Sequence, residues 1–118
     1  MRFCSTISDK VTLFSDEAYY DFIEEKSYPS MVCLVRKGKN IIVSKTFSKV
    51  YRLAGLRIGY LVAKPKVAIN LRKNIMAFTN VLAIKAAKNA IDNQEFYNFS
   101  LNKHSKKKII MEGLKTSI

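Results

Sequence analysis

The chain has 118 residues, of which 48% are hydrophobic and 25% are charged, and this is the composition of an ordinary globular protein. Its length limits it to one domain, and its two cysteines exclude a disulfide-based scaffold. The 21 lysine and arginine residues outnumber 9 acidic residues, and the formal net charge of +12 would attract a polyanion such as nucleic acid.

The distribution of the basic residues does not favour nucleic acid as a partner. They are spread along the chain, and the one run, KHSKKK at 103–108, has no interleaved aromatic residue or glycine. A nucleic-acid footprint usually gathers its cations on one surface and adds stacking side chains. We therefore interpret the run as a solvated helix face. His104, inside the run, has no acidic or cysteine neighbour in sequence and is expected at the surface without a role.

No residue pattern indicates a metal site or a membrane segment. Cys4 and Cys33 fit no metal-ligand spacing, so free thiols in a reducing compartment are expected. No apolar run approaches the roughly 20 residues that cross a bilayer, and the N-terminus lacks the pattern of a signal peptide. These observations predict a cytoplasmic protein.

The first half of the chain predicts three strands and one short helix. A β-prone run at 10–14 stops at a polar and aromatic cluster and places Asp16 after its C-terminal end. A proline at the start and a glycine at the end bracket a short helix over 29–38. Apolar runs at 40–47 and 56–63 are expected to be the second and third strands.

The second half of the chain is predicted to be helical. Pro65 marks the start of this part, and apolar residues recur at helical spacing over 67–78. Thr79 or Asn80 is expected to cap a second helix. A last helix is expected from about 94 towards 114. A strand, a helix, two strands and then helices, in this order, indicate α/β organisation.

Two residues of this pattern, Asp16 and Lys49, are expected at the same edge of the sheet. In open α/β sheets, ligands collect at the carboxyl ends of the strands, where both residues are predicted. An acidic pair after a strand is also common in turns and helix caps. The loop around Lys49 is more specific, because it combines small residues, an apolar strand on each side and Arg57.

The motifs DEAYYDF at 16–22 and SKTFSKVYRLAGLRIGY at 44–60 resemble the cofactor-binding core of the fold-type I pyridoxal-phosphate aminotransferases, and within them the histidinol-phosphate aminotransferase group. That family's pattern is Asp-Glu-Ala-Tyr, then Thr-x-Ser-Lys, a short variable link, and Leu-Ala-Gly-Leu-Arg-x-Gly-Tyr. The sequence supplies every fixed position. The likeness continues through MAFTNVLAIKAA at 76–87 and covers essentially the whole chain.

The resemblance implies a fold for this chain. Residues 1–118 would form part of the large pyridoxal-phosphate-binding domain, with a mostly parallel sheet and flanking helices. The strands and the lysine loop would occupy about 10–63 and the helices about 65–116. Family members are longer and form their sites across a dimer interface, so the chain is expected to be truncated at both ends and inactive alone, with a homodimer in the full-length family.

The resemblance also implies the residues that act on the cofactor. Lys49 would form the Schiff base with the aldehyde of pyridoxal 5'-phosphate and then move a proton, because only a primary amine forms an imine that a substrate amine can displace. Asp16 would pair with the pyridine nitrogen and keep the ring protonated. Tyr19 would donate a hydrogen bond to the 3′ oxygen of the ring.

The same resemblance assigns the phosphate of the cofactor to the lysine loop. Arg57 would bind the phosphate through two parallel hydrogen bonds, and the hydroxyls of Ser48 and Thr46 would bind it as well. Lys45 and Lys64 are expected to be solvated. Arg52 stands in the variable link, where it either adds a cation near the phosphate or faces solvent, and the sequence leaves both open.

The predicted function is transfer of an amino group from a small-molecule amino donor to an oxo-acid acceptor, without a membrane partner. Two alternatives stay open. Related proteins use the same cofactor site to decarboxylate a phosphorylated amino acid. The second alternative is a small basic binding protein in which the motif is inherited but catalytically silent.

Overall fold

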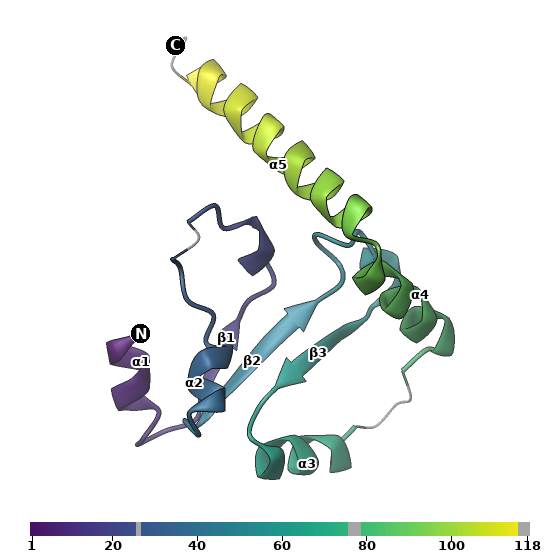
Figure 1. Cartoon of the computed structure of the whole chain (residues 1–118). Helices are drawn as coiled ribbons and strands as arrows, with labels where there is room; N and C mark the ends of the chain where they lie inside the picture. Colours follow the sequence, from purple (N-terminus) through teal and green to yellow (C-terminus); the bar gives the residue numbers. More distant parts are fainter. Residues whose placement is uncertain (26, 76–78, 116–118) are drawn as a thin grey trace.

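A three-stranded sheet forms the centre of the computed structural model, which describes the backbone of residues 1–25, 27–75 and 79–115 and the side chains up to residue 108 (Figure 1). The strands are β1 (Leu13–Asp16), β2 (Ile41–Thr46) and β3 (Gly59–Val62), in the order β1-β2-β3. β1 and β2 are parallel, whereas β2 and β3 are antiparallel. The predicted α/β class is confirmed.

Helical segments precede, connect and follow the strands. They are α1 (Arg2–Ile7), the short 3-10 helix η1 (Tyr20–Phe22), α2 (Val32–Arg36), the 3-10 helix η2 (Ala54–Leu56), α3 (Pro65–Lys73), α4 (Val81–Asp92) and α5 (Gln94–Lys115). Three predicted boundaries are confirmed by this order. Pro65 begins α3, Gln94 begins α5, and the side chain of Asn80 rather than that of Thr79 caps α4 by accepting a hydrogen bond from the Leu82 amide at 2.8 Å.

Other predicted boundaries are wrong. β1 begins at Leu13 rather than at residue 10, because the amides of Lys10 and Val11 donate to the carbonyl of Ile7 and extend the turn that ends α1, a helix the sequence did not indicate. β3 begins at Gly59 rather than at 56. The helix predicted from the apolar pattern over 67–78 stops at Lys73, and positions 76–78 of this pattern lie outside the described residues.

Two small apolar clusters hold the elements together. The first joins α2 to β2 and contains Leu34, Val35, Ile41 and Val43. The second joins the residues around the lysine loop to α4 and contains Phe47, Ile58, Ala83 and Ala87. Side chains along a strand alternate between the two faces of the sheet. Ile41 and Val43 of β2 pack on α2, so the residues next to them in β2 lie on the opposite face.

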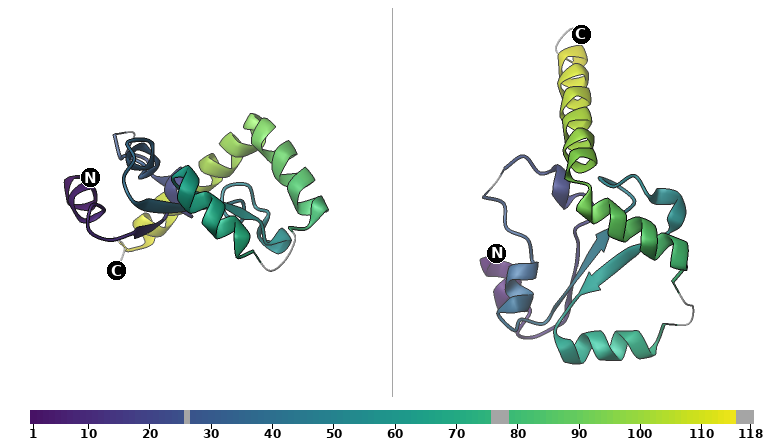
Figure 2. Two further views of the ribbon diagram at one scale, coloured as in Figure 1. Left: turned by 90° about the horizontal axis from the view of Figure 1, so that it is seen from below. Right: turned by 45° about the vertical axis from the view of Figure 1, so that its right-hand side comes forward.

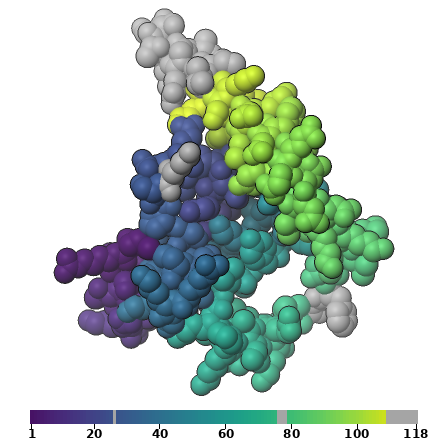
Figure 3. All heavy atoms as spheres, in the orientation of Figure 1, coloured from purple at the N-terminus to yellow at the C-terminus, as the bar shows by residue number. Residues whose placement is uncertain are grey.

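The sheet face opposite α2 is left uncovered by the described residues. Phe14 and Leu61, which lie on this face, are 64% and 49% exposed. The space-filling view shows the molecule open between the sheet, α3 and α4 (Figure 3). The radius of gyration is 17.1 Å, against about 13.5 Å for a compact domain of this length.

The long helix α5 extends away from the sheet, as the two further views show (Figure 2). Near its start, the hydroxyl of Tyr97 donates a hydrogen bond to Asp21 at 2.9 Å, and the Tyr97 ring lies 5.6 Å from that of Tyr51. Burial, together with the Asp21 carboxylate, raises the pKa of Tyr97 well above its ordinary value, so the hydroxyl stays protonated and keeps donating. This contact fixes α5 against η1.

Gly59 and Gly55 offer a matched test of the β2–β3 contact. A Cβ at Gly59 would lie 2.6 Å from the carbonyl oxygen of Lys45, whereas a Cβ at Gly55 would meet nothing within 4 Å. We predict that Gly59→Ala lowers the free energy of unfolding by about 1–3 kcal/mol, because the two strands must separate to admit the methyl group. Gly55→Ala should stay within about 1 kcal/mol of the parent. Urea unfolding measures both, and equal midpoints would contradict this packing.

Candidate active site

A hollow of about 430 Å³ lies at the carboxyl ends of β1 and β2 and gathers five of the six predicted site residues. Its lining consists of Asp16, Ala18, Ser44, Lys45, Thr46, Ser48, Lys49, Ala54, Arg57, Ile58 and Gly59. Asp16, Ser44 and Thr46 belong to the uncovered face of the sheet. The hollow therefore combines a carboxylate, several hydroxyls, a primary amine and a guanidinium group.

Asp16 is held at this edge by its strand register. It lies opposite Ser44, and its Oδ1 accepts hydrogen bonds from the Ser44 hydroxyl at 2.9 Å and from the Ala18 amide at 3.0 Å. Within the part of the chain that the structure describes, its Oδ2 receives no hydrogen bond. One carboxylate oxygen is thus fixed by the protein, and the other is available to a ligand N–H group.

Lys49 has an anchored backbone and an exposed side chain. The residues on either side of it in the loop, Phe47 and Val50, are buried, and the Leu53 amide closes the loop by donating to the Phe47 carbonyl at 3.0 Å. The Lys49 Nζ lies 4.6 Å from the centroid of the Tyr19 ring. Tyr19 itself does not line the hollow, but this contact places it beside the amine.

The hydroxyl of Thr46 shapes the lysine loop. It accepts a hydrogen bond from the Ser48 amide at 3.1 Å and donates one to the Ile58 carbonyl at 3.5 Å. A threonine that bonds the backbone two residues later forms a tight turn without help from a ligand. The hydroxyl of Ser48 receives no such bond from the described residues, so Ser48 is the freer of the two predicted phosphate-binding hydroxyls.

Arg57 and Arg52 both adopt the left-handed backbone conformation, with φ of 51° and 55°. The Arg57 Nη1 donates to the Ala54 carbonyl at 2.9 Å, which aims the guanidinium along the hollow it lines. Arg52 lies elsewhere: its guanidinium is 5.6 Å from the ring of Phe99 on α5. Arg52 therefore does not line the hollow of Arg57.

Arg52 instead lines a smaller, basic hollow of about 120 Å³ against α5, where Lys49, Lys103 and His104 also lie. The His104 side chain is exposed, as expected, and its ring lies 4.4 Å from that of Phe22. Residues 103–108 are exposed apart from the partly buried Ser105, which agrees with a solvated helix face.

The sequence interpretation missed one pair of residues next to the hollow. Lys45 was expected to be solvated, and this is wrong: its side chain is 15% exposed, and its Nζ lies 2.9 Å from Oε2 of Glu17. Because strand side chains alternate, Lys45 points away from the face of Ser44 and Thr46 and meets Glu17 on the other side of the sheet. The sequence does contain a signal for this pair: an acidic residue follows one strand, and a lysine in the next strand points to the same face of the sheet.

Two further features concern metals and membranes. Over 1–25, 27–75 and 79–115, no group of histidine, cysteine and acidic residues could hold a metal ion, and Cys4 and Cys33 are both free cysteines. None of the helices described is both long enough and apolar enough to span a bilayer.

We predict that Thr46→Val lowers the free energy of unfolding by about 0.5–1.5 kcal/mol, because valine keeps the shape but removes the acceptor of the Ser48 amide. Thr46→Ser keeps the hydroxyl and should lose less. Thermal or urea unfolding without any ligand makes the comparison. If Thr46→Val is as stable as the parent, the hydroxyl does not shape the loop.

Comparison with known proteins supports the resemblance of the two motifs. The family model "Aminotransferase class I and II" matches residues 5–112. An aromatic amino acid aminotransferase from Mycolicibacterium smegmatis is 38% identical over 86 residues, which cover 73% of this chain and 24% of that protein. The chain thus spans about a quarter of the length of that curated relative.

Solved structures agree with this match. A structure assigned as histidinol-phosphate aminotransferase, from Erwinia carotovora atroseptica, has a TM-score of 0.87 and 26% identity, covering 98% of this chain and 34% of that one. Histidinol-phosphate aminotransferase from Sinorhizobium meliloti, in complex with pyridoxal-5'-phosphate, has a TM-score of 0.72 and 31% identity, covering 81% of this chain and 26% of that one. The chain belongs to the class I and II aminotransferase family.

Proposed function

We propose that the hollow at the ends of β1 and β2 is the chain's share of a pyridoxal 5'-phosphate site, and that the reaction of the complete site is transfer of an amino group from a small-molecule donor to an oxo acid. The observation that carries this proposal is the set of polar groups around one hollow: the carboxylate of Asp16 and the donors Ser48, Lys49 and Arg57. These groups match the chemical features of the cofactor, which are a basic ring nitrogen, an aldehyde and a phosphate.

When bound, the cofactor supplies an aldehyde that takes up amines and a protonated ring that withdraws electrons. Asp16 would hold the ring proton through its available Oδ2, because its Oδ1 is already fixed by Ser44 and Ala18. Lys49 would attach covalently to the aldehyde and, once released by the amine of the substrate, would move a proton as a free base. Tyr19, beside the Lys49 amine, would orient the ring by a hydrogen bond.

The phosphate would be bound by Arg57 and Ser48. A guanidinium group offers two parallel N–H donors to a phosphate, and the bond from Nη1 to Ala54 fixes the plane of this group while leaving its other nitrogens available. The Thr46 hydroxyl would act through the loop turn rather than by direct contact, since its hydrogen-bonding capacity is used by Ser48 and Ile58.

The names of the matched family and of the curated relative support amino-group transfer as the reaction of the complete protein. The relatives' names differ in substrate, and we propose a substrate of the histidinol-phosphate aminotransferase type because both solved structures above carry that name. Among the described residues that line the hollow, Arg57 is the one arginine. Because the phosphate would occupy it, no second guanidinium is left there for a substrate carboxylate, so we expect little turnover from this chain alone and we propose a homodimer for the complete protein.

Cofactor attachment, rather than turnover, is therefore the appropriate test. We predict that incubation with pyridoxal 5'-phosphate, borohydride reduction and peptide mapping will place the pyridoxyl label on Lys49. Lys45 should not be labelled, because its amine is paired with the buried Glu17 carboxylate. Lys49→Arg should abolish the label. A label on Lys45 or Lys64 that survives in Lys49→Arg would remove Lys49 from the proposed role.

Arg57 and Arg52 provide a matched pair for the phosphate, since they share residue type, loop and backbone conformation. We predict that Arg57→Lys weakens pyridoxal 5'-phosphate binding by about ten- to a hundredfold, because a lysine cannot keep both parallel hydrogen bonds and the one that is lost is worth roughly 1.5–3 kcal/mol. Arg52→Lys should bind as the parent does. Absorbance titration of each variant measures the affinities, and a larger loss at Arg52 would show that the wrong arginine has been assigned.

A further inference from the structure

The strongest feature outside the proposed cofactor contacts is a buried ionic cluster behind Asp16. Glu17 is 8% exposed and accepts hydrogen bonds from the Ser30 hydroxyl at 2.7 Å and the Met31 amide at 2.6 Å. Its Oε2 also pairs with Lys45 at 2.9 Å. A buried carboxylate persists only when it is paired and hydrogen-bonded, and here both conditions are met.

Lys45 connects β2 to the segment that follows β1. Besides pairing with Glu17, its Nζ lies 4.1 Å from the centroid of the Tyr20 ring, and the Tyr20 hydroxyl donates to the Tyr28 carbonyl at 3.0 Å. Through Glu17, the same ammonium group is linked to Met31 at the start of α2. One amine thus joins the end of β2, the turn after β1 and the start of α2.

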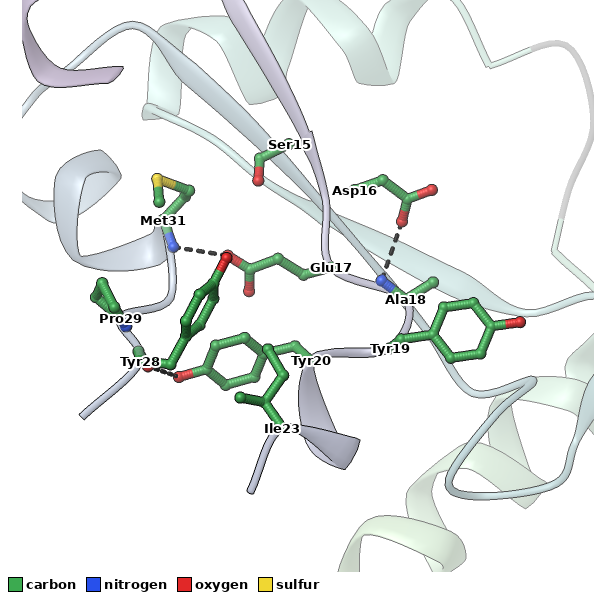
Figure 4. A pocket seen from close by; sticks show the side chains of 10 residues that line it. All are labelled: Ser15, Asp16, Glu17, Ala18, Tyr19, Tyr20, Ile23, Tyr28, Pro29 and Met31. Carbon is green, nitrogen blue, oxygen red and sulfur yellow. Dashed lines mark hydrogen bonds between the residues drawn. The ribbon is translucent and has the colours of Figure 1, made fainter. Parts of the chain in front are cut away.

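This cluster lies directly behind the hollow. Glu17 follows Asp16, and its side chain points to the opposite side of the strand end (Figure 4). Lys45 lies between Ser44 and Thr46, so it too points to the opposite face. The Glu17 amide donates to the Ser44 carbonyl at 3.1 Å and continues the ladder between the strands. A rotation of the end of β1 that turned Asp16 away from the hollow would therefore also pull Glu17 from Lys45.

We propose that Glu17 and Lys45 are positioning residues, whose ion pair fixes the ends of β1 and β2 so that the Asp16 carboxylate keeps one direction into the hollow, towards the ring nitrogen of a pyridine cofactor. Because their side chains point to the opposite face, neither residue would touch the cofactor. A buried ion pair is weak evidence of stabilisation, and its best-attested use is to fix a register. The proposal rests on the proposed function of the hollow, but the orientation of Asp16 exists without cofactor and can be measured alone.

Three variants and one control separate positioning from folding. Lys45→Met leaves the Glu17 carboxylate buried without its ion-pair partner, so this variant should lower the free energy of unfolding the most. The double variant Glu17→Gln/Lys45→Met has no buried charge, and its glutamine side chain can still accept from the Met31 amide. Lys45→Arg keeps the ion pair. The control is Lys39→Met, because Lys39 pairs with Asp9 at 2.7 Å ahead of the same two strands, at the end of the sheet away from the hollow.

The first measurement is the position of the Ala18 amide resonance in the 118-residue chain, because this amide donates to Asp16. Asp16→Ala gives the position without the acceptor. The double variant should move the resonance towards that position while remaining folded, and Lys45→Arg and Lys39→Met should leave it near that of the parent. If the resonance in the double variant stays at the parent position, the pair does not orient Asp16, and the inference is overturned with or without cofactor.

The second measurement is the affinity for pyridoxal 5'-phosphate. The double variant should bind about 10- to 100-fold more weakly, the range found when outer partners of metal ligands are removed, and Lys39→Met should bind as the parent does. If the double variant and Lys39→Met lose the same affinity for the cofactor, the ion pair acts only through the stability of the fold, and the inference is overturned. A parent that does not attach the cofactor at Lys49 would instead refute the proposed function, while the Ala18 resonance would still decide the inference.

Discussion

The alternation of side chains along β2 is the constraint on which the rest of the structure depends. β2 pairs with both other strands, and its residues divide between two faces. Ile41 and Val43 pack on α2 and form the first apolar cluster. Ser44 and Thr46, on the other face, line the hollow. A shift of one residue in register would exchange the two sets and would remove the core and the site together.

The lysine loop shows how an exposed amine can be held by a rigid backbone. Phe47 and Val50 are buried beside it, and the hydroxyl of Thr46 closes the turn that leads into it. At the end of the loop, Arg57 adopts a left-handed conformation that costs a non-glycine residue roughly 1–2 kcal/mol. Strain of this kind persists where the surrounding contacts determine the backbone, and it often occurs at functional sites.

Much of the site could be predicted because its residues lie in two short, local motifs. Asp16 is the last residue of β1, and Lys49 and Arg57 lie in a loop between two strands, so strand order alone brings them to one edge. The pair of Glu17 and Lys45 was not predicted, since a charged residue in a sequence is normally expected in water. Its burial depends on a contact between segments 28 residues apart, which the parallel pairing of β1 and β2 creates.

The element boundaries were less predictable than the site for a related reason. Hydrogen bonds after α1 delay the start of β1, and hydrogen bonds around Arg57 delay the start of β3. The spacing of apolar residues does not reveal these bonds. α5 begins where expected. The hydrogen bond that holds it, from Tyr97 to Asp21, joins residues that are 76 positions apart in the sequence. The sequence pattern indicates the three strands and most of the helices, while local hydrogen bonds and long-range contacts decide where these elements begin and what they touch.

The assignment of the hollow as a cofactor site can be tested by a crystal structure of the chain with pyridoxal 5'-phosphate. We predict continuous density from the Nζ of Lys49 to the cofactor, with Asp16 Oδ2 within about 2.7–3.2 Å of the ring nitrogen and Arg57 on the phosphate. Density for the cofactor away from this hollow, or in the hollow with Asp16 turned from the ring, would contradict it.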